Sequence, residues 1–171
     1  MLYIFGGLPG AGKSTLSAAL AREIRAAYLR VDVVEHAIRA AGGAVNGPEG
    51  YVVCYGLASH NLRLGLDVVA DTVNPLRETR QAWRDVAQSF DIPFLEIEVI
   101  CSDVEEHKQR VETRVIDIPG FTPPTWAEVQ ARHYEHWDRE RIVIDTARHT
   151  PDESIAMLRE RVERARRQRG G

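Results

Sequence analysis

Residues Gly7 to Ser14 have the types and spacing needed to hold a polyphosphate. They follow the pattern GxxxxGK[ST], directly after the apolar run Leu2 to Gly6 and directly before a predicted helix that begins near Lys13. Glycines let backbone amides turn inward around phosphate oxygens, and the start of a helix adds free N–H groups and a positive dipole end. The residues predicted to bind the nucleotide are Gly7, Leu8, Pro9, Gly10, Ala11, Gly12, Lys13, Ser14 and Thr15.

Two side chains of this loop carry the expected chemistry. Lys13 is predicted to reach the β- and γ-phosphates of ATP as a catalytic residue, and the Ser14 hydroxyl to bind Mg²⁺. The alternative is a glycine-rich turn that only packs a strand tightly against a helix. The complete pattern in this context favours an ATP site with Mg²⁺.

Three aspartates, Asp32, Asp71 and Asp145, end predicted strands, where parallel α/β sheets bind ligands. Asp145 is expected to shape the loop beneath the adenine rather than to perform chemistry. Asp32 is a candidate catalytic base that accepts the proton of a substrate hydroxyl or orients that hydroxyl; the alternative is a cap for the helix Val33 to Ala41. Asp71 resembles a Walker B carboxylate that holds Mg²⁺ directly or through water and borders the substrate, or else it is a turn residue.

Arginines at three places are candidate anion ligands. Arg110 and Arg114 share one helix face and are predicted to stabilise charge on the transferred phosphoryl group, with Arg110 also contacting the nucleotide. Arg77 and Arg80 lie one turn apart and are predicted to clamp an anionic substrate. Arg39 is a further substrate candidate, although an ion pair with Glu35 explains it equally well. Each of these arginines has the alternative of a solvated surface residue.

Apolar runs alternate with segments of helical period, which is the pattern of βαβ units and a parallel sheet. The predicted fold class is therefore α/β, with helices flanking the sheet. The predicted strands are Leu2 to Gly6, Ala27 to Asp32, Asp67 to Val73, Phe94 to Cys101 and Ile142 to Thr146.

Helix starts are predicted from capping signals. Ser102, Thr125 and Thr150 each have a glutamate three residues later, which is capping-box spacing. Asn74 followed by Pro75 predicts another start. A helix from about Tyr51 to Leu66 is expected to bury one face, formed by Val52, Tyr55, Leu62 and Leu66.

Two loops rich in glycine or proline are predicted to hold the substrate and a lid. They are residues 42–48 and 118–124, with the lid as a whole at about 108–125. The chain of 171 residues is of the size of one domain, so residues 1–171 are predicted to form a single unit.

Composition excludes several classes of protein. The net charge of −3 gives no global positive field for nucleic acid, and no apolar run approaches the ~18 residues of a membrane span. The two cysteines are too few for a disulfide framework. We expect a cytoplasmic protein.

With these residues in view, the chain resembles the small P-loop kinases related to adenylate, gluconate and shikimate kinases, and especially the kinase-like "AAA family ATPase" and zeta-toxin-like group. The stretches that carry the resemblance are Gly6 to Thr15, Leu29 to Asp32, Asp71 to Pro75 with Arg80, Arg110 to Arg114, and Ile144 to Thr146. The resemblance implies a three-layer fold with a five-stranded parallel sheet in the order 2-3-1-4-5, ATP with Mg²⁺, and a mobile lid that carries arginines. It does not imply a substrate.

The leading hypothesis is transfer of the γ-phosphoryl group of ATP to a hydroxyl of a small-molecule or nucleotide-like acceptor. One alternative is a polynucleotide 5′-hydroxyl kinase that uses Arg77, Arg80 and the arginine-rich C-terminal helix to hold a phosphate backbone. The other is an ATP-binding regulatory module that transfers nothing.

Overall fold

A five-stranded parallel sheet forms the centre of the molecule, as shown by a computed structural model that describes residues 1–115 and 117–169. The strands are β1 Leu2–Gly6, β2 Ala27–Arg30, β3 Val68–Asp71, β4 Phe94–Ile100 and β5 Ile142–Asp145. Their order is β2-β3-β1-β4-β5, which confirms the predicted fold class and strand order. Residue 116 of the predicted lid and residues 170–171 of the predicted domain lie outside the described residues.

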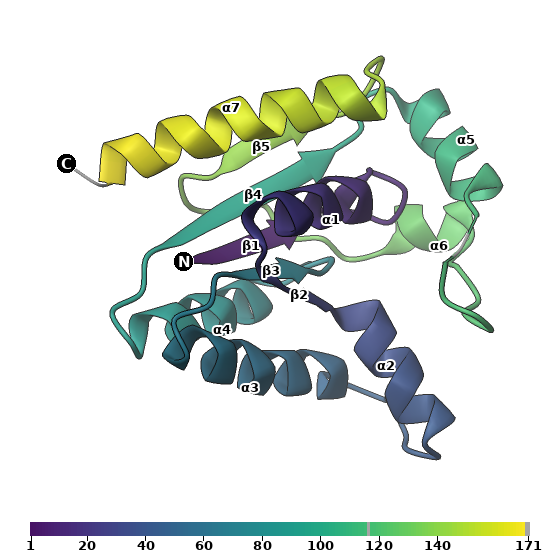
Figure 1. The fold of residues 1–171 in the computed structure, drawn as a ribbon. Coiled ribbons are helices and arrows are strands. Elements are labelled where there is room, and N and C mark those ends of the chain that lie inside the picture. Colours follow the sequence, from purple (N-terminus) through teal and green to yellow (C-terminus); the bar gives the residue numbers. More distant parts are fainter. Residues whose placement is uncertain (116, 170–171) are drawn as a thin grey trace.

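Helices cover both faces of the sheet and give the molecule three layers (Figure 1). They are α1 Lys13–Ile24, α2 Val31–Ala40, α3 Glu49–Arg63, α4 Arg77–Gln88, α5 Val104–Thr113, α6 Trp126–Ala131 and α7 Pro151–Arg169. In the described part of the chain, none of them is long and apolar enough to cross a membrane.

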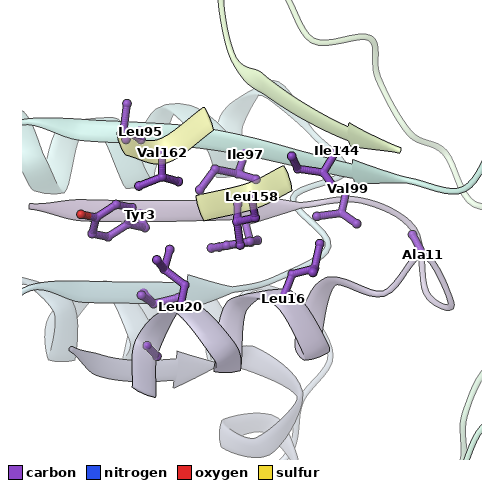
Figure 2. Close-up of a cluster of buried hydrophobic side chains, with 13 residues drawn as sticks. Tyr3, Ala11, Leu16, Leu20, Leu95, Ile97, Val99, Ile144, Leu158 and Val162 are labelled. Atoms are coloured by element: carbon purple, nitrogen blue, oxygen red, sulfur yellow. The ribbon is translucent and has the colours of Figure 1, made fainter. Parts of the chain in front are cut away.

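Each face of the sheet has its own apolar core. Figure 2 shows one of them, in which Leu16 and Leu20 of α1 and Leu158 of α7 pack over the strands. The opposite core contains Trp83 of α4 and Ala58 of α3, both fully buried. Alternate residues of β1 belong to opposite cores, so this central strand is buried on both sides and its carboxyl end is held rigidly.

Several predicted strand ends are wrong by one or two residues. The largest consequence concerns Asp32, because β2 stops at Arg30 and α2 begins at Val31. Arg30 has extended backbone angles and caps α2 without a side-chain hydrogen bond, so Asp32 is neither the end of a strand nor a cap. It lies in the first turn of α2, where its charge complements the helix dipole.

The predicted helix starts have mixed outcomes. The capping boxes at Thr125 and Thr150 are confirmed by reciprocal hydrogen bonds with Glu128 and Glu153. The cap of α5 is Asp103 rather than Ser102, and its side chain accepts from the Glu106 amide.

The predicted helix start at Asn74 is wrong, because α4 begins at Arg77. Asn74 has a left-handed backbone, with φ of 49°, and its side-chain amide donates to the Phe5 carbonyl at 3.0 Å. This bond fixes residue 74 against β1 instead of the helix.

Only part of the predicted buried face of α3 is buried. Leu62 is 4% exposed, but Val52 is 58% exposed and Leu66 is 46% exposed. Cys54 and Ala58 occupy the core in their place, because α3 is rotated so that its smaller side chains meet the sheet.

Candidate active site

The loop between β1 and α1 is built by glycines in conformations that other residues avoid. Gly7, Gly10 and Gly12 have φ of 137°, 85° and 96°. A Cβ on Gly7 would lie 2.1 Å from the Val99 carbonyl oxygen, and a Cβ on Gly10 would lie 2.4 Å from a Val111 methyl group. The loop can therefore curl against β4 and α5 only with glycine at these positions.

Lys13 is held in the centre of this loop. Its side chain is buried, and its ammonium group donates to the Leu8 carbonyl at 3.1 Å. Burial lowers the pKa of Lys13; the charges of Asp71 and Asp32 counteract this effect, and those of Arg114 and Arg132 add to it. A cation with one loop carbonyl as its partner has donors left for phosphate oxygens.

The loop is supported from α5 by His107. Its Nε2 lies 2.8 Å from the Pro9 carbonyl oxygen, and burial lowers the pKa of the imidazole. The neutral ring thus positions the loop without adding charge to it.

A cavity of about 660 Å³ extends from this loop between α2, α5 and the segments that flank α6. It brings together many of the predicted residues, namely Pro9, Gly10, Gly12, Lys13, Ser14, Thr15, Asp32, Arg110 and Arg114. Gly7, Leu8 and Ala11 form the loop behind its wall. Of the two predicted loops, residues 118–124 contribute Phe121 and Pro124 to the lining, and residues 42–48 contribute none among the described residues.

Asp32 faces this cavity from the first turn of α2. It is half-buried, and its carboxylate makes no hydrogen bond or ion pair within residues 1–115 and 117–169. Its charge acts on both Lys13 and Arg114. A carboxylate that faces the cavity and has no partner among the described residues is available to a ligand hydroxyl.

Arg110 joins α5 to the segment after β5. Its guanidinium donates to the hydroxyl and the carbonyl oxygen of Thr146 at 2.7 and 2.9 Å and pairs with Glu106. The Thr146 hydroxyl in turn donates to the Ala11 carbonyl of the loop. Arg110 is therefore fixed beside the loop by its own contacts.

Arg114 differs because its polar atoms lack partners. Its Nε and Nη2 atoms are buried and make no hydrogen bond to the described residues, and burial lowers the pKa of its guanidinium. Buried donors without an acceptor cost free energy unless a ligand supplies one. This arrangement fits an anion in the cavity.

Sequence reasoning missed several residues of the cavity. Arg30, which ends β2, holds Asp117 of the predicted lid through two hydrogen bonds of 2.8 Å, and this contact keeps the pKa of Asp117 below its usual range. Arg132 enters from the end of α6, and Arg22 from α1. The Ser154 hydroxyl is buried at the α7 side of the cavity without a partner among the described residues. Arg30 lies within the stretch Leu29 to Asp32 that carries the family resemblance but was given no role there, and the other residues belong to no local motif.

Arg80 lies outside the cavity in a buried structural position. It is fully buried and donates to the carbonyl oxygens of Asn74, Pro75, Glu135 and His136, with its guanidinium over the Trp137 ring at 4.4 Å. These contacts occupy all of its nitrogens, so the geometry contradicts the predicted substrate contact.

The remaining predicted substrate residues also lie outside the cavity. Arg77 is exposed on α4, and Arg39 pairs with Glu35 at 3.5 Å, which matches the ion pair considered as its alternative. Asp71 is buried behind the wall, where it accepts a hydrogen bond of 2.7 Å from Tyr28 and lies 3.7 Å from Arg30.

The donors present fit a magnesium ion that is held mainly by phosphate oxygens. Ser14 lines the cavity at the start of α1, and its hydroxyl has no partner within the described residues. No group of three or more His, Cys, Asp or Glu in residues 1–115 and 117–169 could hold a metal ion. Mg²⁺ retains waters and needs only one or two protein ligands beside substrate phosphates, so Ser14, with Asp71 behind it, is a sufficient set.

Comparison with known proteins decides the family. A family model described as an AAA domain matches residues 2–117. The chain belongs to this family of P-loop kinases. The predicted kinship with small P-loop kinases is thereby confirmed.

Two proteins similar to this chain in sequence are adenylyl-sulfate kinases, which sequence reasoning did not single out. The adenylyl-sulfate kinase of Picosynechococcus sp. is 32% identical over 147 residues, which cover 75% of this chain and 81% of that protein. The "Probable adenylyl-sulfate kinase" of Aeropyrum pernix is 26% identical over 170 residues, which cover 89% of this chain and 86% of that protein. The structure of the Mycobacterium tuberculosis APS kinase CysC in complex with AMPPNP and APS matches with a TM-score of 0.67 at 19% identity, covering 95% and 96% of the two chains.

Proposed function

We propose that this protein transfers the γ-phosphoryl group of ATP to a hydroxyl of an anionic, nucleotide-like small molecule. The observation that carries the proposal is the cavity shared by the phosphate loop with Lys13, the carboxylate of Asp32 and the guanidinium of Arg114. Within the described part of the chain, this carboxylate and the buried Nε and Nη2 atoms of Arg114 have no hydrogen-bond partner. Kinship with adenylyl-sulfate kinases supports ATP-dependent transfer to a small-molecule acceptor in general.

The nucleotide is bound by the loop of β1 and α1. Its amides and the Lys13 ammonium would hold the phosphates, and the Ser14 hydroxyl would hold Mg²⁺. Bound Mg²⁺ neutralises negative charge on the β- and γ-phosphates.

Asp32 acts on the acceptor. As the acceptor oxygen forms its bond to the γ-phosphorus, the bond from that phosphorus to the β–γ bridging oxygen breaks and ADP leaves. The hydroxyl proton passes to the Asp32 carboxylate. Lys13 and Arg114 stabilise the charge on the transferred group, while Arg110 holds the side of the nucleotide near Thr146.

The charge of the cavity favours an anionic acceptor. Six cationic side chains line it, Lys13, Arg22, Arg30, Arg110, Arg114 and Arg132, against the carboxylates of Asp32 and Asp117. Glu106 and Asp71 also lie beside Arg110 and Arg30, whereas the buried donors of Arg114 have no acceptor among the described residues. Buried cations without a partner are unfavourable. An acceptor with a phosphate or sulfate group would supply a negative charge for Arg114. Adenylyl sulfate has such groups beside ribose hydroxyls and is the first acceptor to test.

The arrangement does not favour a polynucleotide 5′-hydroxyl kinase. Arg80 is buried and Arg77 lies outside the cavity. On the arginine-rich part of α7, Arg166 contacts Asp67 at the amino end of β3, whereas the phosphate loop follows the carboxyl end of β1 (Figure 1). These arginines therefore do not extend the cavity into a basic groove.

The test is transfer of label from γ-³²P-ATP by the purified protein. We expect a labelled product with adenylyl sulfate or another anionic nucleotide, and none with neutral adenosine. Labelled oligonucleotide 5′ ends would instead support the polynucleotide kinase. ATP binding without any labelled product would support the regulatory module.

A further inference from the structure

Helix α3 presents an apolar surface on the side that faces away from the sheet. Val52, Val53 and Leu57 are 58%, 42% and 43% exposed. From Gly50 to Leu62 the sequence contains no Asp, Glu, Lys or Arg. A solvated helix normally carries charged residues on its outer face. Between Glu49 and Arg63, the outer face of α3 is therefore uncharged and mainly apolar, with His60 as an exposed polar side chain.

The patch continues beyond the end of the helix. Leu64 and Leu66 are 65% and 46% exposed. In Figure 1, α3 lies at the lower edge of the molecule, and no α3 residue lines the cavity described above. This exposed apolar surface, which we call the α3 patch, thus has no role in the active site and is accessible from outside.

Gly56 lies in the middle of the α3 patch. A Cβ built at this position would meet nothing within 4 Å, so the described chain gives no packing reason for a glycine. A glycine inside a helix costs about 1 kcal/mol relative to alanine. Close approach of a second backbone would explain it, because only glycine adds no side chain between two helices.

The charged residues at the two ends of α3 indicate that the second backbone is another copy of the same helix. Glu49 and Arg63 flank Gly56 symmetrically, each about two helical turns away on the same face. Arg63 makes no ion pair within the described residues. If a second copy of α3 crosses antiparallel at Gly56, Glu49 meets the partner's Arg63, and the same contact recurs on the other side.

We propose that the α3 patch is the interface of a homodimer, in which two α3 helices pack antiparallel across a two-fold axis near Gly56. A twofold contact requires a surface that complements itself, and opposite charges at equal distances from a central glycine meet this requirement. One helix pair buries less than the roughly 800 Å² per partner of standard interfaces, so the dimer is expected to dissociate in the micromolar range.

Sedimentation velocity of the full chain across the micromolar range tests the proposal. The wild type is expected to pass from one to two copies as its concentration rises, and Gly56→Arg to remain a monomer throughout. Circular dichroism melts and ATP binding report the fold of this variant, whose active site is remote from the substitution.

Charge reversal tests the pairing without altering the packing. Glu49→Arg and Arg63→Glu should each raise the dissociation constant about tenfold, because each places two like-charged pairs in contact, and the double variant should restore it. Glu78→Arg on α4 is the matched control and should leave it unchanged. A wild type that stays monomeric, a dimer that persists in Gly56→Arg, or a double variant that is not restored would each overturn the proposal.

Discussion

The two halves of the active-site cavity differ in how their residues are supplied. The phosphate loop is one continuous segment, and its glycines and Lys13 make contacts set by local backbone geometry. The opposite half is assembled from α2, the end of β2, α5 and the end of α6. The carboxylate of Asp32 and the guanidinium of Arg114 in this half have no partner among the described residues. The donor half is thus positioned by contacts within one segment, whereas the acceptor half depends on contacts between segments that are distant in the sequence.

The largest expected effect is in the donor half. Lys13→Ala removes the cation held at the phosphates, and we expect phosphoryl transfer to fall about 10³-fold or more. Circular dichroism should show a folded protein. Unchanged turnover would show that the loop does not serve the reaction.

The acceptor half should respond to Arg114. Arg114→Ala is expected to lower kcat/KM for an anionic acceptor about 10²-fold, because it removes a buried cation whose donors await an anion. Arg77→Ala, which removes an exposed arginine outside the cavity, is the matched control and should have no effect. Equal losses of kcat/KM in Arg114→Ala and Arg77→Ala would contradict the assignment of Arg114 to the acceptor half.

Substitution of Arg80 tests whether this arginine stabilises the fold or binds the acceptor. Arg80→Ala removes a donor from four backbone carbonyls, of which, among the described residues, only that of Pro75 keeps another donor, the Glu135 amide, so the free energy of unfolding should fall by about 3 kcal/mol. Chemical denaturation measures this loss, and KM for the acceptor should hardly change in the protein that remains folded. A large rise in KM with unchanged stability would restore the substrate role.

The smallest effect concerns the support of the phosphate loop. The pKa of His107 is lowered by burial from its ordinary value of 6.5, so in the window below 6.5 the unfolded chain binds a proton that the folded protein does not. Stability from this group is complete above pH 6.5 and declines as the pH falls toward the lowered pKa. In His107→Gln, the free energy of unfolding from denaturation curves should therefore fall less steeply below pH 6.5 than in the wild type. The same pH dependence in both proteins would contradict this role of His107.

Most of the fold and the donor half could be predicted because their signals are local. The apolar runs predicted the strands of a parallel sheet, and the glycine pattern predicted the loop with Lys13. The order of the strands was implied by the resemblance to small P-loop kinases. The acceptor half could not be predicted in this way because it depends on tertiary contacts. Arg30 and Asp117, for example, are 87 positions apart in the chain, and no local sequence spacing predicts that they form hydrogen bonds. The helical spacing of Arg77 and Arg80 predicted a clamp for an anionic substrate, because spacing alone does not show that the fold buries Arg80. The start of α2 was predicted too late because Arg30 caps this helix without a side-chain hydrogen bond.

The most direct test of the central claim compares the wild type with Asp32→Asn in transfer of label from γ-³²P-ATP to adenylyl sulfate and related anionic nucleotides. The substitution keeps the shape of the side chain but removes its ability to take a proton. We expect ATP binding to persist and transfer to fall roughly 10²–10⁴-fold. Transfer at the wild-type rate by Asp32→Asn, or ATP binding by the wild type with no labelled product, would contradict the account.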